Sequence, residues 1–184
     1  YGAGALAGPA DLHADALWIA GGLYGIAQAL DALESLLAGD HPGARLVFNG
    51  DFHWFDVADE AFARIEAGVS RHVATRGNVE TEIASPHPGA GCGCAYPEWV
   101  DDGDVARSNR VLERLRGTAG RAPHAVRRLA ALPMHRVAEV GGVRIGIVHG
   151  DGESLAGWGF SQEALATPGG IAAAARSFPR AGVG

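Results

Sequence analysis

The chain has 184 residues, of which 47% are hydrophobic and 20% are charged, and its formal net charge is −6. This length suffices for one domain with a buried core, and the composition is typical of a soluble globular protein. The acidic balance excludes the basic stripe by which many proteins bind nucleic acid, and no run reaches the ~18 apolar residues of a membrane span.

Hydrophobic periodicity in residues 1–80 predicts alternating strands and helices. Short runs of apolar and β-branched residues indicate the strands, and apolar residues at helical spacing indicate the helices. Strand–helix–strand–helix–strand is the signature of a parallel sheet. The predicted elements, in chain order, are a strand at residues 17–20, a helix from Ile26 to a stop at Gly39, a strand at 45–48, a helix at 56–67 and a strand at 71–75.

The second half of the chain begins with a stretch rich in Pro, Gly and Asp, which we interpret as a long functional loop or an insertion at residues 83–104. Helices are predicted at residues 104–116 and 122–132, and an Ala-rich helix at 161–175. Between them, residues 137–148 are expected to form a hairpin around a Gly-Gly turn. We expect a single domain over residues 1–184, incomplete at both ends because Met134 is the only methionine and no element closes the chain.

Polar residues follow three of the predicted strands. Asp51 comes after the second strand, Asn78 after the third, and His149 after the last strand of the hairpin. In open α/β sheets ligands bind outside the carboxyl ends of the strands, so these oxygen and nitrogen donors are expected to converge. The sequence therefore predicts a site for a divalent ion of borderline hardness.

The order of these motifs resembles the calcineurin-like metallophosphoesterases. The resemblance spans residues 15–160 and rests on Gly-Asp ending at Asp51, Gly-Asn-x-Glu at residues 77–80, and His149-Gly150. It implies an α/β fold, a four-layer sandwich with two mixed β-sheets flanked by helices, with a dinuclear metal centre that hydrolyses phosphate esters. It also implies that Asp51 is the bridging aspartate, and that Asn78 and His149 bind the same metal ion.

The chain departs from the family pattern in two places. The family's Asp-x-His-Gly-Asn motif after the first strand is replaced by Gly-Leu-Tyr-Gly-Ile at residues 22–26, so both ligands of that motif are absent. The family's general-acid histidine is Val79 here. No Gly-His-x-His segment, which would supply further ligands, occurs in the chain. The resemblance therefore implies an altered or mononuclear centre.

Two residues beside Asp51 are candidates to compensate for these losses. His53 and Asp56 would supply a ligand or a proton, with His53 as the candidate catalytic residue. The alternatives are a surface or packing role for His53 and a helix N-cap for Asp56. Arg76 is a candidate to hold a phosphate bidentately, or else a surface charge at a strand end.

Two further residues are expected to support the site, and two other segments are expected to be structural. Glu80 is expected to orient the metal-binding loop, and Tyr24 to contact the ligands or the substrate from the first-motif position. The Asp-x-His spelling at residues 11–13 precedes the first predicted strand, so a structural role is favoured. For Cys92 and Cys94 a structured loop is favoured over a metal site, because no second pair accompanies them.

The resemblance therefore implies a metal-dependent hydrolase of phosphate monoesters or diesters with an altered or mononuclear centre, for which Mn, Fe or Zn is the expected ion. The alternative is a catalytically degenerate phosphate- or nucleotide-binding module on the same fold. The expected partner is a small phosphate-ester substrate. No membrane is expected, the sequence carries no strong signal for nucleic-acid binding, and the oligomeric state is not predicted. Two cysteines do not make the disulfide framework of a small secreted protein, so a cytoplasmic location is expected.

Overall fold

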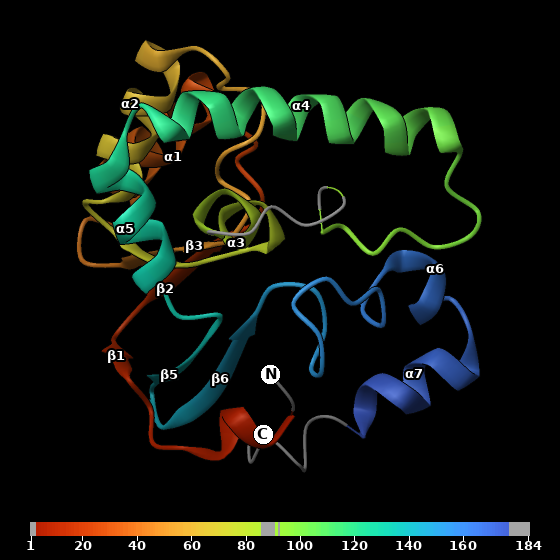
Figure 1. Ribbon diagram of the computed structural model, residues 1–184. Helices are drawn as coiled ribbons and strands as arrows, with labels where there is room; N and C mark the ends of the chain where they lie inside the picture. The colour runs from red at the N-terminus through yellow and green to blue at the C-terminus, as the bar shows by residue number, and fades with distance from the viewer. Residues whose placement is uncertain (1–2, 86–90, 92, 177–184) are drawn as a thin grey trace.

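The computed structural model describes residues 3–85, 91 and 93–176, and it shows a mixed α/β fold (Figure 1). In this part of the chain no helix has the length and apolar character needed to cross a membrane. The elements, in chain order, are the 3-10 helix η1 (Ala3–Ala7), β1 (Leu12–Ala14), β2 (Leu17–Ala20), α1 (Ala27–Asp40), β3 (Arg45–Asn49), α2 (Asp59–Val69), β4 (Val73–Thr75), α3 (Asn78–Ala84), α4 (Asp102–Gly120), α5 (Pro123–Ala131), β5 (His135–Val140), β6 (Val143–Val148), α6 (Gln162–Leu165) and α7 (Pro168–Ala175).

The described strands form two three-stranded sheets, with strand orders β2-β3-β4 and β1-β5-β6. The first sheet is parallel throughout, as the strand–helix alternation predicts, with Ile19, Val47 and Val73 in register across it. In the second sheet β1 is parallel to β5, and β5 and β6 form the predicted antiparallel hairpin. Gly141 and Gly142 make its turn at φ +59° and +81°, a conformation that suits glycine. Only the second sheet is therefore mixed, where two mixed sheets were expected.

The two sheets pack against each other because β3 is buried on both faces. Phe48 lies in the apolar core under the helices, and Val47 points the other way, into a cluster with Ala138 of β5 and Ile147 of β6. On the far side of the second sheet, Val137 packs against Leu6 of η1. The described chain is thus layered as helices, parallel sheet, mixed sheet and η1 (Figure 1).

Several boundaries differ from those predicted. A short strand, β1, precedes the expected first strand; it was missed because only its pairing with β5 makes it a strand. Helix α3 follows β4 directly, where a loop was expected. The Ala-rich tail forms two helices because Pro168 cannot continue α6; Thr167 instead caps α7 by accepting the N–H of Gly170.

A buried charged network holds α2 and α5 to the loop after β3. His53 is fully buried, with Nδ1 2.6 Å from Asp56 Oδ2 and Nε2 3.3 Å from Glu66 Oε2, and its ring stacks on Phe62 at 4.2 Å. Arg128 donates to both oxygens of Glu66 at 2.5 and 2.6 Å. Burial alone would lower the pKa of His53, but its hydrogen bonds to the carboxylates of Asp56 and Glu66 raise the pKa to about 9. Burial would likewise raise the pKa of Glu66, yet its bonds to Arg128 and His53 lower it to about 2.

Removing the shared carboxylate should therefore destabilise the fold. Glu66→Gln leaves Arg128 without its anionic partner and His53 with Asp56 alone. We expect a loss of about 2–3 kcal/mol in the free energy of unfolding, at the low end for buried pairs because Glu66 is not fully enclosed. Asp31→Asn is the matched control, since its ion pair with Arg64 joins two exposed side chains and should cost at most about 1 kcal/mol. Urea unfolding at neutral pH measures both; equal losses would contradict the role of the network.

Candidate functional site

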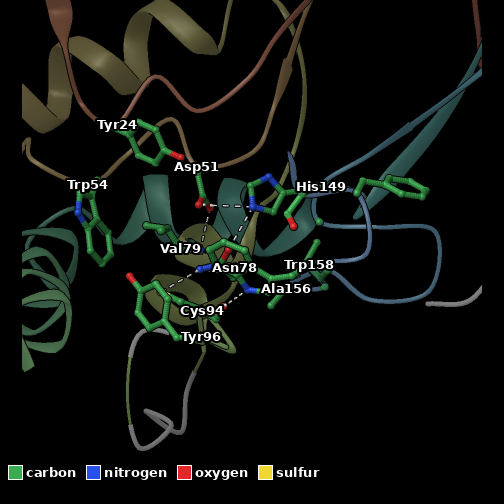
Figure 2. A pocket seen from close by; sticks show the side chains of 15 residues that line it. Tyr24, Asp51, Trp54, Asn78, Val79, Cys94, Tyr96, His149, Ala156 and Trp158 are labelled. Atoms are coloured by element: carbon green, nitrogen blue, oxygen red, sulfur yellow. Dashed lines mark hydrogen bonds and ion pairs between the residues drawn. The ribbon is translucent and has the colours of Figure 1, made fainter. Parts of the chain in front are cut away.

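The carboxyl ends of β3, β4 and β6 meet at one place and bring Asp51, Asn78 and His149 together (Figure 2). Glycines allow the loops to approach closely. A Cβ on Gly77 would lie 2.1 Å from Asp51 Oδ1, and one on Gly50, which has φ +73°, would lie 2.5 Å from the Gly77 nitrogen. The convergence expected from the strand-end positions is therefore present in the fold, although β6 belongs to the other sheet.

The three side chains present electron pairs to one another. His149 Nδ1 lies 2.9 Å from the carbonyl oxygen of Asn49, so this nitrogen carries the proton and donates it. His149 Nε2 then faces Asn78 Oδ1 at 3.1 Å and Asp51 Oδ2 at 3.4 Å. Asn78 presents its oxygen here because its Nδ2 points to Cys94 Sγ, 3.6 Å away. Three acceptors facing one another are stable only with a proton or a cation between them.

Burial alone would lower the pKa of His149, but Asp51 raises it above its usual range through a hydrogen bond and its charge. The negative potential that holds a proton on Nε2 also attracts a metal ion, which would replace that proton. A carboxylate oxygen, an amide oxygen and an imidazole nitrogen suit a divalent ion of borderline hardness. The described residues contain no cluster of three or more His, Cys, Asp or Glu placed for a metal, so the third donor here is an amide.

Asp51 is fixed in position by its neighbours. It is 8% exposed and sits at φ +50°. Its Oδ1 accepts the N–H of Val79 at 3.1 Å, which leaves Oδ2 directed at His149. Its own N–H donates to Glu80 Oε2 at 2.8 Å. The carboxylate therefore has one bonded oxygen and one available to a ligand.

Glu80 is fully buried, and its carboxylate contacts the backbone of the loop after β3 that it was expected to orient. It accepts the N–H groups of Asp51 and Gly77 at 2.8 Å each, and that of His53 at 3.1 Å. Burial raises the pKa of this carboxyl, and the backbone donors oppose that rise. One side chain thus joins the loop after β3 to the start of α3.

A cavity of about 380 Å³ opens over these three residues. Several of its lining residues are aromatic, and Figure 2 shows Tyr24, Trp54, Tyr96 and Trp158 around the site. Of the described non-glycine residues, three have positive φ: Tyr24 (+53°), Asp51 (+50°) and Ala95 (+45°). Tyr24 and Asp51 line the cavity, and Ala95 adjoins the lining residue Tyr96. Backbone strain gathered at one cavity is characteristic of functional sites.

Three of the predicted site residues lie away from the cavity. His53 and Asp56 belong to the buried network, where both ring nitrogens of His53 face carboxylates, so neither replaces a lost ligand. The N-cap alternative for Asp56 is wrong, because α2 begins at Asp59 and Ala58 is its N-cap. Arg76 donates from Nη1 to the carbonyl of Ala130 at 3.0 Å, so its guanidinium lies against the end of α5.

Tyr24 takes the first-motif position at the cavity, as expected. Burial, followed by the charge of Asp51, raises the pKa of its hydroxyl. The Asp-x-His spelling at residues 11–13 lies elsewhere: Asp11 pairs with Arg136 at 3.4 Å, and His13 is exposed on β1. Cys92 lies outside the described residues.

Sequence reasoning missed the aromatic wall and the role of Asn49. Tyr96 falls in the predicted loop or insertion at residues 83–104 but carries no predicted role of its own, and Trp54 and Trp158 give no signal beyond lying near Asp51 and His149 in the chain. Asn49 donates from Nδ2 to the carbonyl of Val148 at 2.6 Å and accepts from Thr75 Oγ1 at 3.1 Å. It therefore ties together the ends of all three strands.

Comparison with known proteins gives little further guidance. No protein-family model matches the chain, and no curated protein matches it. Among solved structures, a hypothetical protein from Pyrococcus horikoshii OT3 is similar over 76% of this chain and 56% of its own, with 19% identity and a TM-score of 0.48. The chain thus spans just over half the length of that protein, and a likeness at this level assigns neither family nor function.

The turn after β2 can be used to test whether a second metal position can be rebuilt. Gly22 does not have positive φ, but a Cβ there would lie 2.5 Å from the ring of Tyr24. Gly22→Asp alone should therefore destabilise the protein. Gly22→Asp with Tyr24→His removes that ring and places a carboxylate and an imidazole at the cavity, and histidine tolerates positive φ better than most residues.

We expect the double variant to bind additional divalent metal per chain, measured by elemental analysis after dialysis, with thermal unfolding as the check on folding. Tyr24→His alone is the control and should leave the metal content unchanged. A folded double variant with the metal content of the unmodified chain would contradict the expected correspondence between residues 22–26 and the Asp-x-His motif of the metallophosphoesterases.

Proposed function

We propose that this chain is a metal-dependent phosphoesterase domain of the calcineurin-like type, in which one metal position remains. Asp51, Asn78 and His149 would hold the ion. The observation that carries the proposal is the convergence of three acceptor atoms, Asp51 Oδ2, Asn78 Oδ1 and His149 Nε2, on one point at the floor of a cavity. We propose for this chain the four-layer sandwich of that family and also its substrate class, phosphate esters.

The donors fit such an ion chemically. Hydrogen bonding of His149 Nδ1 to a backbone carbonyl leaves Nε2 to bind metal, an arrangement common for metal-binding histidines. When bound, the ion would neutralise phosphoryl oxygens and lower the pKa of a water molecule from 15.7 to roughly 7. The chain's own part is to hold the ligands, through Glu80 and the N–H of Val79, and to enclose the substrate.

The group that assists departure of the leaving group would differ from the histidine used in the family. Val79, at the position of the family's acid, is 2% exposed and brings no proton. The hydroxyl of Tyr24 lines the cavity, and its raised pKa keeps it protonated at neutral pH. Tyr24 is therefore placed to donate a hydrogen bond to a substrate oxygen.

The first test is metal content. Reloaded with Mn²⁺ after chelation and dialysed, the protein should retain about one ion per chain, because one position keeps its donors. Asp51→Asn should weaken Mn²⁺ binding by more than about 100-fold, since even residues that only support ligands are worth 10–100-fold. The fold should persist, because asparagine can still accept the N–H of Val79.

Asp56→Asn is the matched control. It changes a buried aspartate of the same loop that faces His53 and not the cavity, so it should lower stability and leave Mn²⁺ binding intact. Calorimetry and elemental analysis measure both variants. Full Mn²⁺ retention by Asp51→Asn would refute the ligand assignment. An unmodified protein that holds no metal would instead support a degenerate binding module.

A further inference from the structure

We infer that the cavity selects a phosphodiester with one negative charge and a planar aromatic group, in preference to a phosphate monoester with two charges. The inference rests on the proposed function, and it names the substrate class of the same site. Two independent features of the cavity carry it: the charges that line it and the rings that enclose it.

The first feature is a lack of cationic side chains. Among the described residues that line the cavity there is no arginine, and the sequence contains no lysine. The arginines nearest in the chain to Asn78 and His149 are engaged elsewhere: Arg76 donates to the carbonyl of Ala130, and Arg144 donates to the carbonyls of Leu6 and Gly8. A phosphate dianion is normally held by such groups, often bidentately. In this cavity the metal ion alone would neutralise the charge of the phosphate.

The charge balance then favours a monoanion. A divalent ion bound by the Asp51 carboxylate, neutral Asn78 and neutral His149 leaves a net charge of about +1. The buried carboxylate of Glu80, bonded to the Asp51 N–H, adds negative charge close to the site and disfavours a dianion further. A diester anion matches this balance, whereas a monoester dianion leaves one charge uncompensated in a partly enclosed, low-dielectric site.

The second feature is a set of rings held in place. The indole N–H of Trp158 donates to the carbonyl of Cys94 at 3.1 Å, and the hydroxyl of Tyr96 is 2.8 Å from Ser108 Oγ. The rings of Tyr96 and Trp158 contact each other, with centroids 6.1 Å apart. In Figure 2, Trp54 and Tyr24 lie to one side of the Asn78–His149 pair and Trp158 to the other.

Rings fixed in this way bind another planar ring at little entropic cost, because they are already ordered. They are also sequence-tolerant platforms that take a nucleobase or a simple aryl group equally by its π-face. The shared chemistry of the ligand is therefore a flat aromatic ring on a phosphodiester. Which ring occupies the site is decided by the probes below.

The experiment compares matched probes on the Mn²⁺-loaded protein at pH 8 by calorimetry. Methyl phenyl phosphate and phenyl phosphate share a ring and differ by one negative charge; dimethyl phosphate keeps the single charge and lacks the ring. We expect methyl phenyl phosphate to bind about tenfold more tightly than either other probe. Phenyl phosphate carries a second charge that the site does not compensate, and dimethyl phosphate has no ring to stack. Thymidine 5′-(methyl phosphate) as a fourth probe separates a nucleobase from a simple aryl group.

Trp158→Ala should weaken binding of methyl phenyl phosphate at least roughly fivefold, leaving Mn²⁺ content and the affinity for dimethyl phosphate unchanged. Phe55→Ala is the control, because Phe55 is 63% exposed and does not line the cavity. Trp54→Ala, on the other wall, gives a second variant if Trp158→Ala fails to fold.

The outcomes separate this inference from the proposed function. Protein that holds Mn²⁺ but binds phenyl phosphate as tightly as its methyl ester overturns the charge argument alone. Equal affinity for methyl phenyl phosphate and dimethyl phosphate, or no effect of either tryptophan variant, overturns the aromatic argument. Protein that holds no Mn²⁺ overturns the proposed function and this inference together.

Discussion

The buried carboxylate of Glu80 is the interaction on which the site depends. A fully enclosed carboxylate is costly unless donors surround it, and here three backbone N–H groups, from Asp51, His53 and Gly77, do so. Two of them share one oxygen, so the loop after β3 and the start of α3 cannot separate without stranding a buried charge. Asp51 and Asn78 are therefore presented from a single rigid unit.

The third donor comes from a different sheet, and Asn49 makes that connection. Its side chain donates to the carbonyl of Val148, and its own carbonyl accepts from His149. Beneath it, Val47 packs against Ala138 and Ile147, so the two sheets are held in contact by an apolar cluster directly below the polar site. Burial of that cluster, which is non-directional, brings the sheets together, and the hydrogen bonds of Asn49 set their alignment.

One short loop serves both function and stability. Asp51 turns toward the cavity at positive φ, whereas His53 turns into the core and joins Asp56, Glu66 and Arg128. The strained conformation persists because the surrounding contacts determine it. The same few residues therefore connect the cavity to helices α2 and α5.

The sequence by itself determined the parallel order of the first sheet, the Gly-Gly hairpin, and the strand-end positions of Asp51, Asn78 and His149. These follow from local periodicity and from the rule that parallel strands present their carboxyl ends together. Only the tertiary structure decided the direction of His53, Asp56 and Arg76, because burial and hydrogen-bond partners distant in the chain set which way a polar side chain points. The same holds for β1, which is a strand only beside β5, and for the aromatic wall, whose rings come from four segments that no local pattern relates.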